Sequence, residues 1–262
     1  MTGGPTPLLC LPGLTRSSKD FHDLATRFGR ERRVIAPDYR GRGRSAHATD
    51  WTSYRVDVEL SDAILLLDTL GVSQVAVVGT SRGGLIAMAM ATTHKTRLAG
   101  VLLNDIGPRL EPEGLKRIAG YLGQPPAGTS WEDAVRGLKG TQAGFESLSE
   151  EEWAAFARRI YRDADGRPAL DYDPALAKTF PRKEELSGPL PELWDAFDAL
   201  AGLPVTVLRG ALSDLLSQRT VAEMAARMPG LDAVTVSGRG HAPFLNEPES
   251  LAALDRLLSR TA

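Results

Sequence analysis

Short apolar runs alternate along the chain with segments whose hydrophobic residues recur at helical spacing. These runs are rich in Val, Ile and Leu and nearly continuous, as strands are when helices cover both faces of a parallel sheet. Their alternation with helical segments predicts an α/β fold built from βαβ units. The predicted strands lie at residues 6–11, 33–37, 74–79, 98–103, 204–209 and 232–236.

Two of the intervening segments carry clear helical signals. In the first, one core-facing stripe is formed by Val56, Leu60, Ile64 and Leu67. In the second, near the end of the chain, "NEPE" (246–249) predicts a helix start. Pro248 suits a first turn, and Asn246 and Glu249 have the spacing of a capping box.

The alternation breaks over residues 107–203, where only helical patterns are found. The chain is therefore predicted to consist of a first core part (1–106), an inserted helical cap (107–203) and a second core part (204–262). The insert holds most of the aromatic residues of the chain. They either form a small core of the insert itself or line a pocket beneath a lid, and the pattern leaves both open.

Composition and charge are those of an ordinary globular protein. The 262 residues are 42% hydrophobic with a net charge of −2, which indicates no nucleic-acid or membrane partner. No apolar run is long enough to cross a bilayer and the start lacks signal-peptide features, so a cytoplasmic location is expected. The single cysteine, Cys10, is interpreted as a buried hydrophobe. The four histidines show no metal-ligand spacing.

The strand predicted at 74–79 ends in "GTSRG" (79–83), a G-x-S-x-G motif directly before a helical segment. In this setting the serine occupies a strained strand-to-helix turn, and the glycines allow the two elements to pack closely. The pattern predicts that Ser81 is a nucleophile, which needs a base to take its proton. The backbone N–H of Arg82, at the start of the helix, is a candidate donor to an oxyanion.

The partners of the serine are sought at the same edge of the sheet. His241 lies in the shaped loop "SGRGHAPF" after the last predicted strand and is predicted to be the general base and acid. Asp214, in the loop after the strand at 204–209, is the favoured acid to orient the imidazole, although it could also cap a helix. Asp105, directly after the strand at 98–103, is the alternative acid.

The loop "LPGLTR" after the first strand is predicted to supply the second oxyanion donor. Gly13 permits close approach of the backbone, and the N–H of Leu14 follows it. Arg16 and the side chain of Arg82 are possible substrate-binding groups, since either could hold a carboxylate by a bidentate contact. The alternative is that Arg82 pairs locally and Arg16 is solvated.

Taken together, these motifs resemble those of the α/β-hydrolase superfamily, in particular small bacterial serine hydrolases with a helical cap. The resemblance implies a mostly parallel central sheet with helices on both faces and an inserted cap. It also implies a triad of Ser81, Asp214 and His241, oxyanion donors at Leu14 and Arg82, and no metal or organic cofactor. The motifs are "LPGL" (11–14), "PDYRGRGRS" (37–45), "GTSRGG" (79–84), "NDIGP" (104–108), "RGALSD" (209–214) and "GRGHAPFLNEPE" (238–249).

The chain departs from this family at its start. Two antiparallel strands usually precede the "LPGL" strand, and the sequence begins almost at that strand. The strand at 33–37 is then expected at an exposed sheet edge, and unpaired edges invite pairing with another chain. We expect either a truncated start or a partner that covers this edge, such as a second copy in a homodimer.

Three functions are compatible with the residues. The favoured one is a serine hydrolase that cleaves a small ester, lactone or thioester through an acyl-enzyme intermediate. The second uses the same triad to cleave a carbon–carbon or carbon–nitrogen bond in a small acidic metabolite. The third is a ligand receptor without catalytic activity, against which the intact triad argues. The fold alone does not choose among them, because one fold hosts many chemistries.

Overall fold

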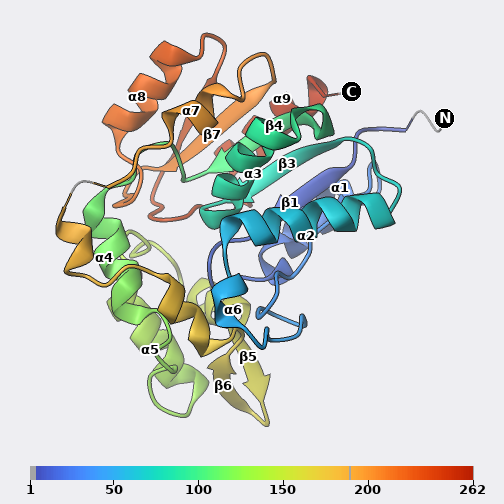
Figure 1. Cartoon of the computed structure of the whole chain (residues 1–262). Coiled ribbons are helices and arrows are strands. Elements are labelled where there is room, and N and C mark those ends of the chain that lie inside the picture. Colours follow the sequence, from blue (N-terminus) through green and yellow to red (C-terminus); the bar gives the residue numbers. More distant parts are fainter. Residues whose placement is uncertain (1–3, 189, 262) are drawn as a thin grey trace.

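A computed structural model describes residues 4–188 and 190–261, and a six-stranded sheet lies at its centre (Figure 1). The strands run in the order β2-β1-β3-β4-β7-β8, and every neighbouring pair is parallel. All six predicted strands are confirmed to within two residues at each end. They are β1 (Leu8–Leu11), β2 (Val34–Ile35), β3 (Val75–Thr80), β4 (Leu98–Asn104), β7 (Val205–Gly210) and β8 (Asp232–Val236).

Helices cover both faces of this sheet, as the continuous apolar strands predicted. Successive strand residues point to opposite faces. In β1, Leu8 and Cys10 pack against one helical layer, and Leu9 and Leu11 against the other. The first layer contains α1 (His22–Phe28) and α9 (Pro248–Ser259), and the second contains α2 (Val56–Thr69), α3 (Arg82–Thr93) and α8 (Gln218–Arg227). Short 3₁₀ helices lie at η1 (Ser18–Phe21), η2 (Trp51–Ser53) and η3 (Lys95–Arg97).

Cys10 is fully buried between these layers, as expected of a small hydrophobe. Burial raises the pKa of its thiol well above the ordinary value, which keeps the sulfur in its unreactive protonated form. The cysteine therefore belongs to the core.

The last helix begins at Pro248 as predicted, but its cap differs from the prediction. Glu247 is the N-cap residue, and no capping box forms between Asn246 and Glu249. The Glu247 carboxylate instead accepts hydrogen bonds from Arg239 Nε (2.9 Å) and the Phe244 N–H (2.8 Å). Its role is to fix the loop that precedes the helix.

The predicted insert contains both helices and strands, and its first part gathers on one side of the sheet (Figure 1). The expectation that it holds no strand was wrong, because β5 and β6 pair as an antiparallel hairpin. Asp165 and Gly166 both have positive φ, of 52° and 82°, as a two-residue type I′ turn requires. This part contains α4 (Pro112–Tyr121), α5 (Trp131–Thr141), α6 (Glu150–Ile160), β5 (Tyr161–Ala164), β6 (Arg167–Leu170), η4 (Pro174–Thr179) and η5 (Glu185–Ser187). We call these residues, 112–187, the cap.

The aromatic residues of the cap both build a small core and line a cavity. Trp153 and Phe156 of α6 pack with Phe145, and Phe156 also faces the cavity. Phe244, from the loop before α9, inserts into the same cluster, with its ring centroid 4.7 Å from Phe156 and 5.1 Å from Phe145. The cap core is thus joined to a loop of the sheet domain.

The remaining part of the insert packs away from the cap. The short helix α7 (Trp194–Asp198) contacts α3 and places Phe197 in the main core, where it is fully buried. Figure 1 shows α7 beside β7 and α8, apart from α4, α5 and α6.

The sheet edge at β2 is short, since only Val34 and Ile35 pair with β1. β2 lies at the end of the strand order, where the sequence predicted an edge. The homodimer through this edge stays a prediction.

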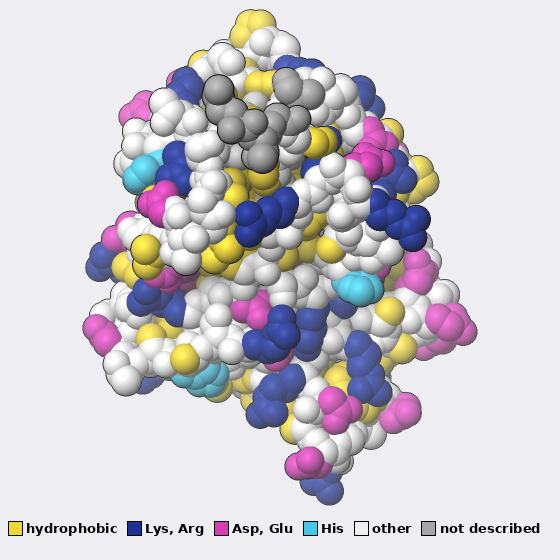
Figure 2. Space-filling model, turned by 90° about the vertical axis from the view of Figure 1, so that its right-hand side faces the viewer, with side chains coloured by type: hydrophobic (Ala, Val, Ile, Leu, Met, Phe, Trp, Pro, Cys, Tyr) yellow, Lys and Arg dark blue, Asp and Glu magenta, His cyan; other side chains and the backbone are white. Residues whose placement is uncertain are grey.

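The surface offers no area of a single charge on the face shown in Figure 2, where acidic and basic side chains are interspersed. Within residues 4–188 and 190–261, no helix combines the length and apolarity needed to span a bilayer. In the same residues, no three His, Cys, Asp or Glu side chains gather as a metal site would require.

Phe197 offers a test of the packing between the insert and the main core. Phe197→Ala is expected to lower the free energy of unfolding by about 3–5 kcal/mol, because it leaves a cavity against α3. Leu193→Ala is the matched control at the start of the same helix, where the side chain is 37% exposed, and should cost under about 1 kcal/mol. Urea unfolding followed by circular dichroism measures both. Equal effects of the two variants would contradict the placement of α7.

Candidate active site

Ser81 stands on a tight turn between β3 and α3, with strained backbone angles of φ 50° and ψ −113°. Gly79 is required because an added Cβ would lie 2.6 Å from the Gly83 carbonyl carbon. A side chain on Gly83 would in turn collide with the Leu11 carbonyl oxygen. The Ser81 N–H donates to the Asn104 carbonyl at 3.0 Å, which holds the strained residue in place. The predicted elbow is present in full.

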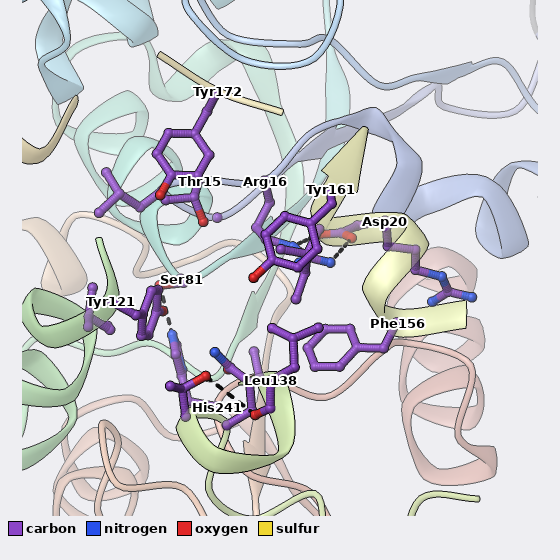
Figure 3. Close-up of a pocket in the computed structure, with 18 of the residues that line it drawn as sticks. Thr15, Arg16, Asp20, Ser81, Tyr121, Leu138, Phe156, Tyr161, Tyr172 and His241 are labelled. Atoms are coloured by element: carbon purple, nitrogen blue, oxygen red, sulfur yellow. Dashed lines mark hydrogen bonds and ion pairs between the residues drawn. The ribbon is translucent and has the colours of Figure 1, made fainter. Parts of the chain in front are cut away.

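A continuous hydrogen-bonded series runs from this serine into the core. Ser81 Oγ lies 2.9 Å from His241 Nε2 (Figure 3), and His241 Nδ1 lies 2.7 Å from Asp105 Oδ2. The His241 side chain is 8% exposed and Asp105 is fully buried. With its proton on Nδ1, the imidazole donates to Asp105 and its Nε2 is free to accept the serine proton.

The Asp105 carboxylate is fixed by further donors from the loop after β7. The Gly210 N–H donates to Oδ1 at 2.7 Å, and Ser213 Oγ donates to Oδ2 at 2.6 Å. Asp105 itself has a positive φ of 53°, which turns its side chain toward these donors. A carboxylate held on three sides can set the orientation of the imidazole.

The structure therefore corrects the predicted acid: Asp105, not Asp214, contacts His241. Both carboxylate oxygens of Asp214 are taken by Arg117 of α4, with Nε 2.6 Å from Oδ2 and Nη2 2.8 Å from Oδ1. Burial raises the pKa of Asp214, but the hydrogen bonds and charge of Arg117, together with the charge of His241, lower it by more, so the net pKa is below the ordinary value. Asp214 joins the cap to the sheet domain.

Three residues of the site were not predicted. Asn104 is fully buried and its Nδ2 donates to Thr80 Oγ1 and to the Pro243 carbonyl, both at 3.0 Å. Asn104 thus connects the serine turn to the histidine loop. The other two residues are Ser213, which donates to Asp105, and Glu247, which accepts from the histidine loop. The polar pair "ND" at the end of an apolar strand was the available signal for Asn104 and Asp105.

The two predicted oxyanion donors flank the serine. Arg82 is the first residue of α3, where backbone N–H groups have no partner within the helix. Leu14 follows Gly13, at which a Cβ would come within 3.8 Å of Ser81 Cβ. In the described part of the chain, neither the Leu14 nor the Arg82 N–H donates to another protein atom. Their role as oxyanion donors stays a prediction.

The two arginines considered as substrate anchors are already paired. Arg82 Nε donates to Glu59 Oε2 at 2.5 Å and Nη2 donates to the Tyr54 carbonyl at 3.0 Å. Arg82 is thus paired as the alternative expected, but with partners distant in the sequence. Arg16 faces the cavity and binds both carboxylate oxygens of Asp20 (Figure 3). Binding of substrate by Arg16 stays a prediction.

A cavity of about 310 Å³ lies between the cap and the serine. Its walls are mainly apolar and aromatic, with Leu138, Phe156 and Tyr161 from the cap opposite Ser81 and His241 (Figure 3). This combination of apolar walls with a few convergent polar groups is typical of a small-molecule site.

A profile of the Alpha/beta hydrolase family matches residues 8–254. The chain belongs to this family. It is 39% identical over 254 residues to the 3-hydroxybutyrate-oligomer hydrolase of Cupriavidus necator, covering 95% of this chain and 86% of that protein. The crystal structure of an α/β hydrolase from Novosphingobium aromaticivorans shares 44% identity at a TM-score of 0.90, covering 99% of this chain and 91% of that one.

A more distant relative is the 2-(acetamidomethylene)succinate hydrolase of Mesorhizobium japonicum, with 27% identity over 248 residues, 93% of this chain and 84% of that protein. Family and relatives identify the chain as an enzyme of the hydrolase type, so the hypothesis of a receptor without activity is set aside. The resemblance stated from the sequence is confirmed.

Substitution of the two candidate acids tests the corrected geometry. Asp105→Asn should slow the reaction of Ser81 with a fluorophosphonate by about 10³–10⁴-fold, because the imidazole loses its orienting carboxylate. Asp214→Asn should change the same rate less than about tenfold, since it does not contact His241. The rate constant is followed by intact mass. A larger loss in Asp214→Asn than in Asp105→Asn would contradict the assignment.

The contact between Asp214 and Arg117 should make stability depend on pH. The folded-state pKa of Asp214 is lowered, so its contribution is present above the unfolded pKa, near 3.9, and is lost as pH falls through the folded value. At pH 7 we expect Asp214→Asn to lower the free energy of unfolding by about 1 kcal/mol, and this difference should vanish once the pH falls below the folded-state pKa of Asp214. Urea unfolding against pH measures it. In an Arg117→Met background, Asp214→Asn should change the free energy of unfolding little at either pH. If Asp214→Asn still costs as much in that background, the pair with Arg117 is not the cause of the pH dependence.

Proposed function

We propose that this hydrolase is a serine esterase that cleaves small carboxylic esters through an acyl-enzyme intermediate. The observation that carries the proposal is the series Ser81–His241–Asp105, which ends at the cavity beneath the cap. Such a series activates a serine hydroxyl that is otherwise a weak nucleophile near neutral pH.

In the first step Ser81 Oγ attacks the ester carbonyl while His241 Nε2 takes the serine proton. Charge develops on the carbonyl oxygen, and the N–H groups of Leu14 and Arg82 stabilise it. Asp105 holds the imidazolium that forms. His241 then gives the proton to the leaving alkoxide, which departs as the alcohol and leaves Ser81 acylated.

In the second step a water molecule replaces the alcohol. His241 Nε2 takes a proton from the water as its oxygen attacks the acyl carbon, and the same two N–H groups hold the second oxyanion. Collapse of this intermediate returns the proton to Ser81 Oγ and releases the carboxylic acid. The cycle uses only groups of the chain and water.

As substrate class we propose short esters of hydroxy acids. The support is the 39% identity, over nearly the full chain, to a hydrolase of 3-hydroxybutyrate oligomers. The cavity is at the small end of ligand sites, which suits a short ester. Lactones and thioesters share the same reacting carbonyl and are the neighbouring possibilities.

A second function keeps the same residues but cleaves a carbon–nitrogen or carbon–carbon bond. The similarity to a 2-(acetamidomethylene)succinate hydrolase supports this candidate, at lower identity. Arg16 in the cavity wall is the group that could then hold a substrate carboxylate, although Asp20 already neutralises it. An enamide substrate separates the two candidates.

The proposal predicts one covalent adduct and one substrate preference. A fluorophosphonate should add once, at Ser81. Ser81→Ala should abolish the adduct and lower kcat by at least about 10⁴-fold. Dimers and trimers of 3-hydroxybutyrate should be hydrolysed with release of the free acid, faster than an enamide of a dicarboxylic acid. Mass spectrometry and product analysis measure these results.

Activity on the enamide without activity on the esters would transfer the assignment to the second function. A chromogenic ester should also show a burst of alcohol equal to the enzyme concentration where deacylation is slower than acylation. Failure of the folded protein to form any adduct would overturn both functions at once.

A further inference from the structure

Three charged side chains form a buried group behind the serine turn. Glu59 of α2 is fully buried, the Arg42 side chain is also fully buried, and the Arg82 side chain is 14% exposed. Arg42 Nη1 lies 2.8 Å from Glu59 Oε1, and Arg82 Nε donates to Glu59 Oε2 at 2.5 Å. One carboxylate therefore bridges two guanidinium groups.

This group contacts both residues that carry the oxyanion donors. Arg42 Nε donates to the Leu14 carbonyl at 2.9 Å, which fixes the backbone of the loop after β1. Arg82 supplies the other N–H from its own backbone, and its side chain is anchored to Glu59 and to the Tyr54 carbonyl. A single network thus reaches the two donor residues, which lie 68 positions apart in the sequence.

The charges of the group do not cancel, since two guanidinium groups meet one carboxylate. Tyr39 and Tyr54, whose rings lie 5.6 and 5.3 Å from the Arg42 guanidinium carbon, add no charge near neutral pH. Asp62 of the same helix pairs with Arg40 through contacts of 2.8 and 2.7 Å, so this carboxylate is already neutralised. One positive charge therefore remains in excess in the group.

Such a group is costly for the fold. Burial lowers the pKa of Arg42, although Glu59 opposes that effect. Replacing buried ion pairs by apolar residues of similar volume is often neutral or stabilising, so stability does not explain why the group is present. Its contacts with Leu14 and Arg82 offer an explanation in the reaction.

We propose that Arg42, Glu59 and Arg82 are positioning residues for the oxyanion hole, which they hold in shape and to which they add one buried positive charge. This inference rests on the proposed function, in which the Leu14 and Arg82 N–H groups bind the oxyanion. The oxygen carries little charge in the bound ester and nearly a full charge in the tetrahedral intermediate. The group should therefore act on kcat and leave KM nearly unchanged.

Arg82→Met is the central test, because it keeps the backbone N–H and leaves Arg42 and Glu59 as a neutral pair. We expect kcat to fall by about 10–100-fold, with KM within about twofold. Affinity for a trifluoromethyl ketone, which forms an oxyanion on Ser81, should fall by the same factor. Affinity for the carboxylic acid product should not change. Arg82→Lys should recover part of kcat, because the charge returns.

Arg42→Met provides an independent test, since it also leaves a neutral pair, between Glu59 and Arg82. It should lower kcat and ketone affinity in the same way. Glu59→Gln is less suitable, because two uncompensated guanidinium groups would remain buried and folding could fail. Asp62→Asn is the matched control: it removes a carboxylate of the same helix that pairs with Arg40, and it should leave kcat, KM and ketone affinity at wild-type values.

The outcomes separate this inference from the proposed function. If the wild type forms no Ser81 adduct and cleaves no ester, the proposed function fails. Suppose instead that the wild type is active and that the Arg82→Met variant is folded. If that variant then keeps kcat and ketone affinity within about twofold of wild type, the positioning role is overturned. If Arg82→Met lowers kcat and product affinity equally, and Arg82→Lys recovers neither, the group has only a packing role. That result would also overturn the positioning role.

Discussion

The close approach of α3 to β1 and β3 is the constraint on which the site depends. Gly83 lies against the Leu11 carbonyl and Gly79 against Gly83, so no side chain can be added at either position. This packing forces Ser81 into a positive φ and projects its hydroxyl from the end of the sheet. The same turn places the Arg82 N–H at an open helix start. The proposed nucleophile and the proposed oxyanion donor are thus two consequences of one steric arrangement.

The order of the parallel strands determines which acid reaches the histidine. β4 lies between β3 and β7, so the residue that follows β4 is flanked by the serine turn and by the loop after β7. Asp105 occupies that middle place and collects donors from Gly210, Ser213 and His241. The loop after β7 contributes hydrogen-bond donors to the site, and its own carboxylate, Asp214, points to the cap.

The parts of the fold and site that rest on local patterns could be predicted from the sequence. The six strands, the elbow at Ser81 and the histidine loop each carry their signal within about ten residues. The choice between Asp105 and Asp214 has no such signal, because both follow parallel strands at the same edge. What turns Asp214 away from His241 is its contact with Arg117, which lies 97 positions away in the sequence, on a helix of the cap. The hairpin at 161–170 was missed because its strands are short, although its Asp-Gly turn was visible.

The cap and the histidine loop form one packed unit, so the shape of the cavity and the geometry of catalysis are coupled. Phe244, three residues after His241, stacks on Phe145 and packs at a tilt against Phe156 of the cap. The Gly240 backbone also lies directly against the Ala143 carbonyl, with no room for a side chain. A change in the cap core that shifts Phe156 therefore alters a wall of the cavity and the support of His241 together. Substrate selection by the cap is for this reason expected to act on kcat as well as on KM.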